Sequence, residues 1–406
     1  SYVDGICSAD GAIDPSWAQV NSTATWNEAV ADGKNIVVTA DFTTNAQLQI
    51  TKAITVNGNG HTITAGSWAD TNPDSKGDAN LVSINAGDNA VIIKNITLAE
   101  AKTINNDENN KDYASGLNVY MSSNVTLDKV TLKDNAAAGL VVNGSTVKAT
   151  GLVTSGNGWG GVNVDKGTNV TDATTFTFDA ASTFNETAKV YSDNGSVTVN
   201  APEGWACAQV SGKYIWAKLF EGGNGSEEKP YLISTAEQFK AIDNIASAEK
   251  IYYQLTNSFT VTREDAYTDG AFYAVLKELS NCVLDGNGNT ITVDDSSGML
   301  DLIYTVNEAT IKNLKVILDY SLSVECSATT FNDVDVLGAF EVTGNEGAYV
   351  IYATPLTPGE NHSTNGLTTY STTINFENCD ANVQMIGSGS HTNYNAVFVG
   401  YAMYYN

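Results

Sequence analysis

A segment that repeats at a regular spacing restricts the possible folds of this chain more than any other feature. Three glycine-apolar pairs lie 23 and then 22 residues apart: Gly116-Leu117, Gly139-Leu140 and Gly161-Val162. Three valines keep nearly the same step: Val125, Val147 and Val170. A period of about 20 to 30 residues indicates stacked supersecondary units, none of which can bury its apolar face alone.

Each repeat unit has the pattern of short β-strands. Apolar residues alternate with polar ones, as at Leu117 and Val119, and Asn, Asp, Gly and Ser separate the runs. A propeller blade needs roughly 40 residues, and a leucine-rich repeat needs a fixed leucine and asparagine pattern that is missing here. The remaining architecture is a parallel β-helix, in which three short strands make one coil and each strand pairs with its equivalent one coil away.

Length and charge limit the organisation and the partners. The 406 residues predict two units, and 46 acidic against 20 basic residues give a net charge of -26. Such a field repels nucleic acid and anionic membranes, so we exclude both as partners. No apolar run approaches the roughly 20 residues that cross a bilayer. We expect a monomer that does not span a membrane, and interpret the start at Ser1 as a mature or trimmed form of an exported protein.

The five cysteines do not predict a disulfide framework. They are scattered and odd in number, without a CxxC pair: Cys7, Cys207, Cys282, Cys326 and Cys379. We interpret them as small buried hydrophobic residues rather than as disulfide partners or metal ligands.

The two halves of the chain share an order of elements. Thr25 to Glu28 matches a capping box that opens a short helix, and Ser234 to Glu237 opens a second one. The segments 58–64 and 286–292 differ only at their fourth residue. We infer an internal duplication and two tandem β-helices, each opened by a short helix that covers the first coil and protects a sheet edge.

The boundary between the halves falls where the composition changes. Residues 197–217 have the pattern of a closing hairpin, and residues 221–226 that of a polar, glycine-rich linker. We therefore predict a first domain over residues 1–219 and a second over residues 220–406.

Polar residues at matching turns predict a further structural element. Asn95, Asn313 and Asp333 occupy equivalent places between two strand runs, and Asn378 is a fourth candidate. A side-chain amide there can bond to the backbone and to the amide of the next coil, which would build a ladder with a structural role.

These features resemble a known superfamily. The coil length, the asparagine turns and the Gly-Asn-Gly turn before Thr-Ile-Thr resemble the pectate-lyase-like right-handed parallel β-helix proteins. The run 221–239 is similar to the opening of repeat domains in exported bacterial surface proteins and adhesins. The resemblance implies an all-β fold of two tandem right-handed parallel β-helices. This scaffold carries lyases, hydrolases, esterases and passive surface proteins, so function must be argued from a site.

Candidate catalytic residues are few. A lyase of this superfamily would be expected to use a basic residue to take a proton alpha to a uronate, and the one arginine, Arg263, is more simply a solvated loop charge. A glycosidase needs two carboxylates about 5 to 10 Å apart. Asp333 and Asp335 would share one face of a strand, and Asp294-Asp295 follow another, but such pairs arise by chance in an acidic chain.

The three histidines carry no catalytic or metal signature. His61 stands where the duplicated segment has Asn289, so we interpret it as a turn side chain, and His362 and His391 lie in polar loops.

Two coil insertions and three aromatic residues form the predicted binding site. Residues 70–78 and 105–112 interrupt successive coils and should project from one side of the solenoid. Their oxygen atoms could hold calcium, although neither insertion matches a calcium-loop pattern; solvated loops are the simpler interpretation, and we predict no metal site and no required cofactor. The ligand-binding candidates are Trp159, Trp68, Tyr113, Asp107 and Asp112. Trp159 is flanked by glycines and could join an aromatic platform for a sugar face, although packing under a loop is the favoured alternative.

The sequence thus favours a non-catalytic protein, secreted or on the surface of a bacterial cell, an adhesin that binds a glycan or another surface molecule. The alternative is a glycoside hydrolase or polysaccharide lyase on the same scaffold, and a third reading is a structural stalk. Residues 396–405 form an apolar, strand-like stretch. We expect either residues from the insertion between Ala353 and Tyr370 or further protein to cover the last coil.

Overall fold

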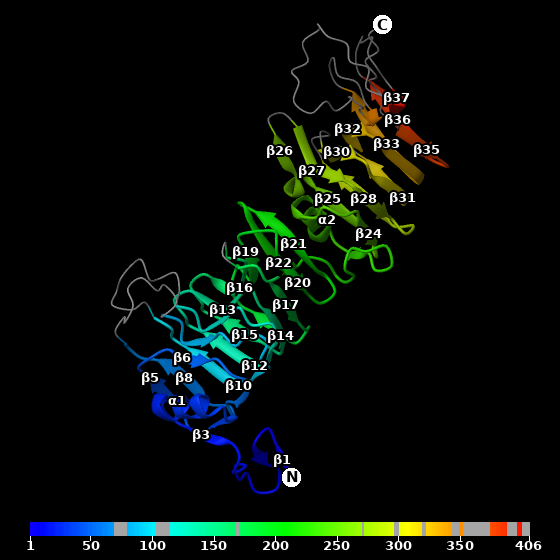
Figure 1. The fold of residues 1–406 in the computed structure, drawn as a ribbon. Coiled ribbons are helices and arrows are strands. Elements are labelled where there is room, and N and C mark those ends of the chain that lie inside the picture. The colour runs from blue at the N-terminus through cyan, green and yellow to red at the C-terminus, as the bar shows by residue number, and fades with distance from the viewer. Residues whose placement is uncertain are drawn as a thin grey trace. The chain divides into compact units, whose positions relative to one another are not determined.

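The computed structural model consists of two compact units, each built of parallel sheets (Figure 1). It describes residues 1–68, 79–102, 114–167, 170–269, 272–295, 300–318, 322–342, 349–351, 374–387 and 396–399. The first unit comprises residues 1–202 and 207–217, and the second comprises residues 203–206 and 218–406. The chain therefore changes units at the base of a hairpin, where the sequence predicted a single crossing between residues 219 and 220.

Three faces of parallel strands form the first unit, which confirms the predicted β-helix. The first face contains β3 (Ala18–Val20), β4 (Ile36–Val38), β7 (Ile54–Asn57), β10 (Val91–Ala99), β12 (Val125–Lys133), β14 (Thr146–Thr150), β17 (Thr175–Phe178) and β20 (Thr198–Asn200). The second contains β5 (Phe42–Thr44), β8 (Thr62–Ala65), the later halves of β10 and β12, β15 (Val153–Ser155) and β18 (Thr183–Phe184). The third contains β6 (Leu48–Ile50), β9 (Val82–Ile84), β11 (Leu117–Tyr120), β13 (Ala138–Asn143), β16 (Gly160–Asp165) and β19 (Val190–Ser192).

An antiparallel hairpin ends the third face. The sequence predicted one within residues 197–217 with its first strand at 197–199, but those residues enter β20 of the first face and the hairpin begins only at Trp205. Its strands are β21 (Trp205–Val210) and β22 (Lys213–Lys218), and β22 pairs with β19 in the antiparallel sense. Ser211 and Gly212 form its turn, with φ angles of 51° and 80°. Because an antiparallel strand breaks the parallel stacking order, the hairpin marks the end of this sheet.

Inward-facing residues stack into continuous apolar rows. In the third face the row is fully buried: Leu48, Val82, Leu117, Leu140, Val162 and Val190. Each such side chain contributes about 2 kcal/mol of hydrophobic free energy relative to exposure. The predicted glycine-apolar repeat is confirmed here, because Leu117 pairs with Leu140 and Leu140 with Val162.

The valine repeat is correct for one step and wrong for the next. Val125 pairs with Val147, but Val147 pairs with Phe176 rather than with Val170. Val170 is buried in the connection after β16, where its Cγ1 would lie 2.1 Å from a Cβ added to Gly144. The longer connection shifts the register, and spacing alone could not reveal this.

The bend between the first and second faces depends on single residues with positive φ. Asn95 and Lys129 have φ angles of 49° and 54°, and Asn313, Asp333 and Asn378 have angles between 51° and 53°. These residues are skipped in the pairing between neighbouring strands, as at Asn95, which lies between the pairs formed by Lys94 and Ile96. The predicted equivalence of the four Asn and Asp turns is confirmed, since these residue types tolerate the left-handed region best after glycine.

The predicted ladder at those turns takes another form. Asn313 donates from Nδ2 to a carboxylate of the neighbouring coil, Asp285 Oδ1, at 3.0 Å. An amide ladder stands instead at the corner between the second and third faces, where Asn135 Nδ2 donates to Asn157 Oδ1 at 2.8 Å and Asn157 Nδ2 donates to Glu186 Oε1 at 2.6 Å. Both asparagines are buried, because this corner closes over the core.

The duplicated glycine turn is confirmed in both units. Asn57 Oδ1 accepts a bond from Asn59 N, and Asp285 Oδ1 accepts one from Asn287 N, at 2.9 and 2.8 Å. A Cβ on Gly58 would lie 2.4 Å from Ile96 Cβ, so the next coil excludes any side chain at this position.

Each unit opens with a helix, although both begin at other residues than predicted. The helix α1 (Thr23–Asp32) is capped by Ser22, whose hydroxyl accepts from Thr25 N while Thr25 Oγ1 accepts from Ser22 N. Glu28, the predicted partner in the capping box, does not belong to the observed one, because the Thr25 hydroxyl accepts the bond from the backbone N–H of the capping residue Ser22. Gly33, in the left-handed conformation with φ of 66°, ends the helix. Trp26 Nε1 donates to Gln49 O of the edge strand β6, so α1 covers that edge.

The second helix is shorter. Thr235 caps α2 (Ala236–Lys240), one residue later than predicted, and the 3-10 helix η3 (Ala241–Asn244) follows. Phe239 and Ile242 are buried. The preceding segment 221–226 is an ordered turn rather than a flexible linker, because Asn224 N and Gly225 N both donate to Lys229 O.

The second unit repeats the three-faced architecture. Its first face contains β23 (Tyr231–Ile233), β24 (Ile251–Leu255), β28 (Cys282–Asp285), β31 (Thr310–Leu318), β33 (Thr329–Val342) and β35 (Ile374–Glu377). The second contains β25 (Phe259–Thr262), β29 (Thr290–Asp294), the later halves of β31 and β33, and β36 (Asp380–Gly387). The third contains β26 (Tyr267–Asp269), β27 (Phe272–Ser280), β30 (Leu300–Asn307), β32 (Ser323–Ser327), β34 (Tyr349–Ile351) and β37 (Ala396–Val399), with β26 antiparallel at its edge and the 3-10 helix η4 (Arg263–Asp265) before it.

The N-terminal segment folds back on the first face of its unit. Its strands β1 (Tyr2–Val3) and β2 (Ile6–Cys7) pair in the antiparallel sense. Lys94 Nζ lies 2.7 Å from Asp4 Oδ2 and 3.8 Å from Asp128 Oδ2, and the Lys94 side chain is only 16% exposed. A lysine thus links the segment to the outer surface of the first face.

All five cysteines lie in described residues and all are free thiols. Cys282 and Cys326 are buried, as the interpretation as small hydrophobic residues predicted, and the other three are half-buried. Burial raises the pKa of Cys282 to about 12, so this thiol is neutral and unreactive.

Candidate functional site

Two of the predicted binding residues, Trp68 and Trp159, lie at one corner of the first unit, between its second and third faces. Trp68 follows β8 and leads to β9, and Trp159 precedes β16. Tyr113, Asp107 and Asp112 fall between β10 and β11 in the sequence, outside the described residues. Trp68 and Trp159 are three coils apart, roughly 14 Å at the usual strand spacing.

The backbone around Trp159 is fixed by close packing. A Cβ on Gly158 would lie 2.3 Å from Ala136 O, so the chain there touches the preceding coil. Trp159 N donates to Ala137 O at 3.3 Å. The equivalent residues of the two preceding coils, Ala137 and Ala114, are buried, whereas Trp159 is 45% exposed. The indole is thus a large apolar surface presented to solvent at an ordered position, while Trp68 is half-buried.

Next to this corner, the outer side of the third face carries mainly neutral polar groups. We call it the amide face, and it consists of two aligned rows: Gln49, Ser83, Asn118, Val141 and Asn163, then Tyr120, Asn143 and Asp165. Neighbouring rungs lie about 4.8 Å apart. Amide and hydroxyl groups both donate and accept hydrogen bonds, so this face suits a neutral, hydroxyl-rich ligand better than an ion.

The single carboxylate of the amide face is already engaged. Asp165 Oδ1 accepts from Asn194 Nδ2 at 3.1 Å and from Lys166 N at 2.7 Å. The row ends at Tyr191, which pairs with Asn163 and is covered so that burial raises its pKa. Lys213 Nζ lies 5.5 Å from the centre of its ring. The open part of the face therefore runs from Gln49 to Asn163.

The carboxylate pairs considered for a glycosidase are separated by the fold. Asp333 occupies the positive-φ bend of β33, so the strand alternation that would place Asp335 on the same face is interrupted there. Asp294 is exposed, but Asp295 is only 5% exposed. Neither pair therefore supports a glycosidase site, in line with the interpretation of both pairs as chance occurrences in an acidic chain.

The prediction that Arg263 is a solvated loop charge is wrong. Its Nη1 lies 2.8 Å from the buried Asp295 Oδ2, and its guanidinium carbon lies 3.5 Å from the centre of the Tyr273 ring. A planar guanidinium that pairs with a buried carboxylate and stacks on an aromatic ring stabilises the fold around η4. The sequence placed Arg263 beside two other acids, and only the tertiary structure brings Asp295 to it.

His61 behaves as the predicted turn side chain. Its Nδ1 lies 3.0 Å from Asp41 Oδ1, the oxygen that also accepts from Thr62 N. The equivalent Asn289 bonds to backbone carbonyls. His362 and His391 lie outside the described residues. Within the described ranges no group of three or more His, Cys, Asp or Glu side chains is arranged to hold a metal ion.

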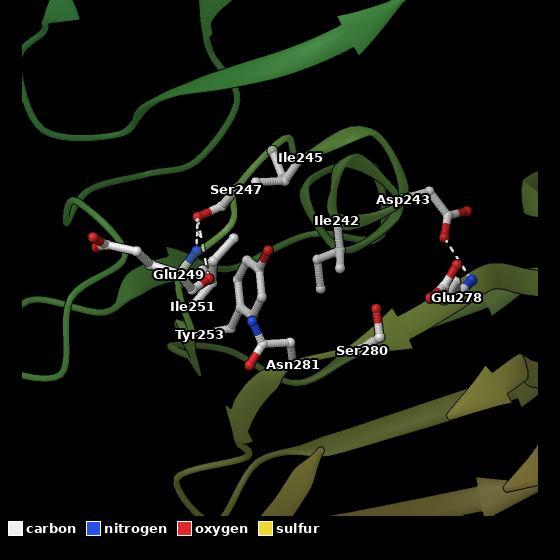
Figure 2. Close-up of a pocket in the computed structure, with 10 residues that line it drawn as sticks. All are labelled: Ile242, Asp243, Ile245, Ser247, Glu249, Ile251, Tyr253, Glu278, Ser280 and Asn281. Carbon is white, nitrogen blue, oxygen red and sulfur yellow. Dashed lines mark hydrogen bonds between the residues drawn. The ribbon is translucent and has the colours of Figure 1, made fainter. Parts of the chain in front are cut away.

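Sequence reasoning missed a pocket in the second unit, which Figure 2 shows. Its volume is about 160 Å³. The lining residues come from η3, the following loop, β24 and the end of β27: Ile242, Asp243, Ile245, Ser247, Glu249, Ile251, Tyr253, Glu278, Ser280 and Asn281. These residues span 40 positions and share no motif, so no signal in the sequence alone would have united them.

Comparisons with known proteins give a limited result. No family model matches the chain. A curated relative is Halomucin of Haloquadratum walsbyi, 27% identical in an alignment of 248 positions that covers 55% of this chain and 3% of Halomucin. Among solved structures, a family 28 exopolygalacturonase of Yersinia enterocolitica overlaps 94% of this chain and 78% of its own, with 11% identity and a TM-score of 0.28. The fold assignment therefore rests on the strand pairing of the chain itself. No helix in the described part of the chain has the length and apolar character needed to span a membrane.

Proposed function

We propose that this chain is a binding module of an exported cell-surface protein, and that the amide face and Trp159 bind a neutral glycan. The observation that supports the proposal is the exposed indole held beside rows of amide and hydroxyl groups. A sugar ring presents an apolar face that packs on an aromatic ring and hydroxyls that bond to amides. The net charge of -26 favours a neutral ligand over an anionic one.

The match to this chain covers only about 3% of the length of Halomucin. We therefore propose that, in a protein of that kind, this chain would be one module of a much longer polypeptide. A glycan ligand accounts for the surface chemistry without a catalytic pair. Secretion, adhesion and the identity of the glycan are parts of the proposal.

The test is affinity electrophoresis of the purified chain through gels that contain neutral or acidic polysaccharides. We expect retardation by at least one neutral polysaccharide, and loss of most of it in Trp159→Ala and in Asn118→Ala. Ile317→Ala, which removes an exposed apolar side chain of the second unit, is the matched control and should migrate as the parent protein does. Retardation that is unchanged in both first-unit variants would contradict the proposed site.

Incubation of the purified chain with the same polysaccharides distinguishes binding from catalysis. New reducing ends or unsaturated products, assayed with and without calcium, would show that the chain is an enzyme and would replace the binding proposal. Retardation without product would support it.

A further inference from the structure

Asn-Gly pairs recur along this chain, and in such a pair the amide group of the asparagine is easily lost by cyclisation. Glycine has no side chain to block the reaction, so its backbone nitrogen can reach the side-chain carbonyl carbon of the preceding asparagine. The chain has eight such pairs, of which the pair 365–366 lies outside the described residues. The seven described pairs begin at Asn57, Asn59, Asn143, Asn157, Asn194, Asn224 and Asn287.

In six of the seven described pairs a hydrogen bond holds the glycine N–H. The acceptors are Lys94 O for Gly58, Asn95 O for Gly60, Thr174 Oγ1 for Gly144, Asn135 O for Gly158, Lys229 O for Gly225 and Asn313 O for Gly288, at 2.8 to 3.0 Å. Gly195 is the exception among the described pairs, because it is exposed and its N–H donates to no described residue. A bonded N–H cannot attack until its bond has broken, so the fold leaves the nucleophile ready at Gly195.

Three of the pairs belong to the same tripeptide, which allows the effect of the fold to be separated from that of the sequence. The Asn-Gly-Ser tripeptides are residues 143–145, 194–196 and 224–226. Asn194 Oδ1 accepts a bond from Ser196 N at 3.1 Å. Asn224 Oδ1 accepts the equivalent bond from Ser226 N, also at 3.1 Å. Such a turn folds the side-chain carbonyl back over the following backbone, so these two sites differ mainly in whether the glycine N–H is bonded.

We propose that Asn194 is a site of spontaneous deamidation, a covalent modification in which water is the co-reactant. Gly195 N gives its proton to the solvent and attacks Asn194 Cγ. The new C–N bond closes a succinimide ring as the bond to the amide nitrogen breaks and ammonia leaves. Water then adds to either ring carbonyl and reopens the ring, which yields aspartate or isoaspartate. Ammonia is released and water consumed in equal amounts, and no atom is oxidised or reduced.

The reaction changes the charge of the turn after β19, at one end of the amide face. Asn194 Nδ2 donates to Asp165 Oδ1 at 3.1 Å. A carboxylate at position 194 cannot donate this bond, and it places a third acid beside Asp165 and Asp193. Lys213 Nζ, 3.5 Å from Asp193 Oδ1, is a cation of this turn. The deamidation does not depend on glycan binding.

The experiment incubates the full chain in mildly alkaline buffer and follows the three tripeptides by mass spectrometry. Trypsin releases them on separate peptides, residues 134–148, 190–213 and 219–240. An unincubated sample is digested in parallel, so that reaction during digestion can be subtracted. We expect Asn194 to react at least about fivefold faster than Asn143 or Asn224, because a hydrogen bond that must break before the attack slows the step by about that factor.

Two controls separate the fold from the sequence. Guanidinium chloride unfolds the same chain and frees all three glycine nitrogens, so the three rates should converge. Asn194→Gln, whose longer side chain cyclises far more slowly, should abolish the conversion at position 194 and leave the rates at Asn143 and Asn224 unchanged. Equal rates in the folded chain, a faster reaction at Asn143 or Asn224, a difference that persists after unfolding, or aspartate without isoaspartate would each overturn the proposal.

Discussion

Replacing Asn157 by alanine should destabilise the first unit by about 3 to 5 kcal/mol. The side chain is 6% exposed and makes four bonds. Its Nδ2 donates to Leu132 O at 3.0 Å and to Glu186 Oε1 at 2.6 Å, and its Oδ1 accepts from Asn135 Nδ2 at 2.8 Å and from Asn135 N at 3.2 Å. Alanine leaves at least the two Asn135 donors and one carbonyl without partners inside the corner. Each buried group without a partner costs about 1 to 3 kcal/mol, and the costs within one network do not add fully.

The assay for this substitution is urea unfolding followed by tryptophan fluorescence. Five of the six tryptophans lie in the first unit, so the signal reports mainly on it. Asn118→Ala is the matched control, because its one described bond, from Nδ2 to Ser83 Oγ, is 3.5 Å long and only partly buried. We expect the control to change the free energy of unfolding by less than about 0.5 kcal/mol. A cost below about 1 kcal/mol for Asn157→Ala would refute the idea that the buried ladder holds the corner.

Three further substitutions test other parts of the fold. Gly58→Ala should cost about 2 kcal/mol or more in the same urea assay, because the added Cβ would meet Ile96 of the next coil at 2.4 Å; a neutral result would mean that the coils separate easily. Lys94→Met should cost about 1 kcal/mol at low salt by leaving two acids without their shared cation, and the loss should shrink at high salt, which screens partly exposed charges; a salt-independent loss would point to packing instead. Asp243 has a raised pKa in the folded chain, so its contribution to stability is present at low pH and is lost as pH rises through that raised value. Asp243→Asn, in which one oxygen can still accept both backbone bonds, should therefore raise the Tm increasingly above pH 4 by calorimetry, and a constant difference across pH would contradict this.

The local patterns of the sequence identified the architecture because a β-helix is made of local repeats. The step from Leu117 to Leu140 and Val162 is one coil, and the duplicated Gly-Asn-Gly turn marks the same bend in both units. Four of the bends lie at Asn or Asp residues that the sequence comparison had aligned, and these residue types tolerate the left-handed backbone conformation better than other non-glycine residues. Where the chain inserts residues, as before Phe176, spacing no longer predicts register, since the extra length is invisible to a fixed period.

The helix starts were displaced by one to three residues for a related reason. Several hydroxyl residues precede each helix, and any of them can cap it by sequence alone. Ser22 caps α1 because Trp26 must reach Gln49 of the edge strand, and that packing fixes where the first turn begins.

The sequence by itself determined the repeating coil, its turns, the duplication and the acidic surface, because each of these depends on neighbours in the chain or on composition. Only the tertiary structure decided which side chains meet across coils. It brought Asp295 to Arg263, built the ladder of Asn135, Asn157 and Glu186, and assembled the pocket of the second unit from η3, β24, β27 and the loop after η3. Stacking of the coils places residues that are 20 to 40 positions apart in the sequence side by side, at about 4.8 Å. The sequence around either residue does not reveal which residue of the next coil it will contact.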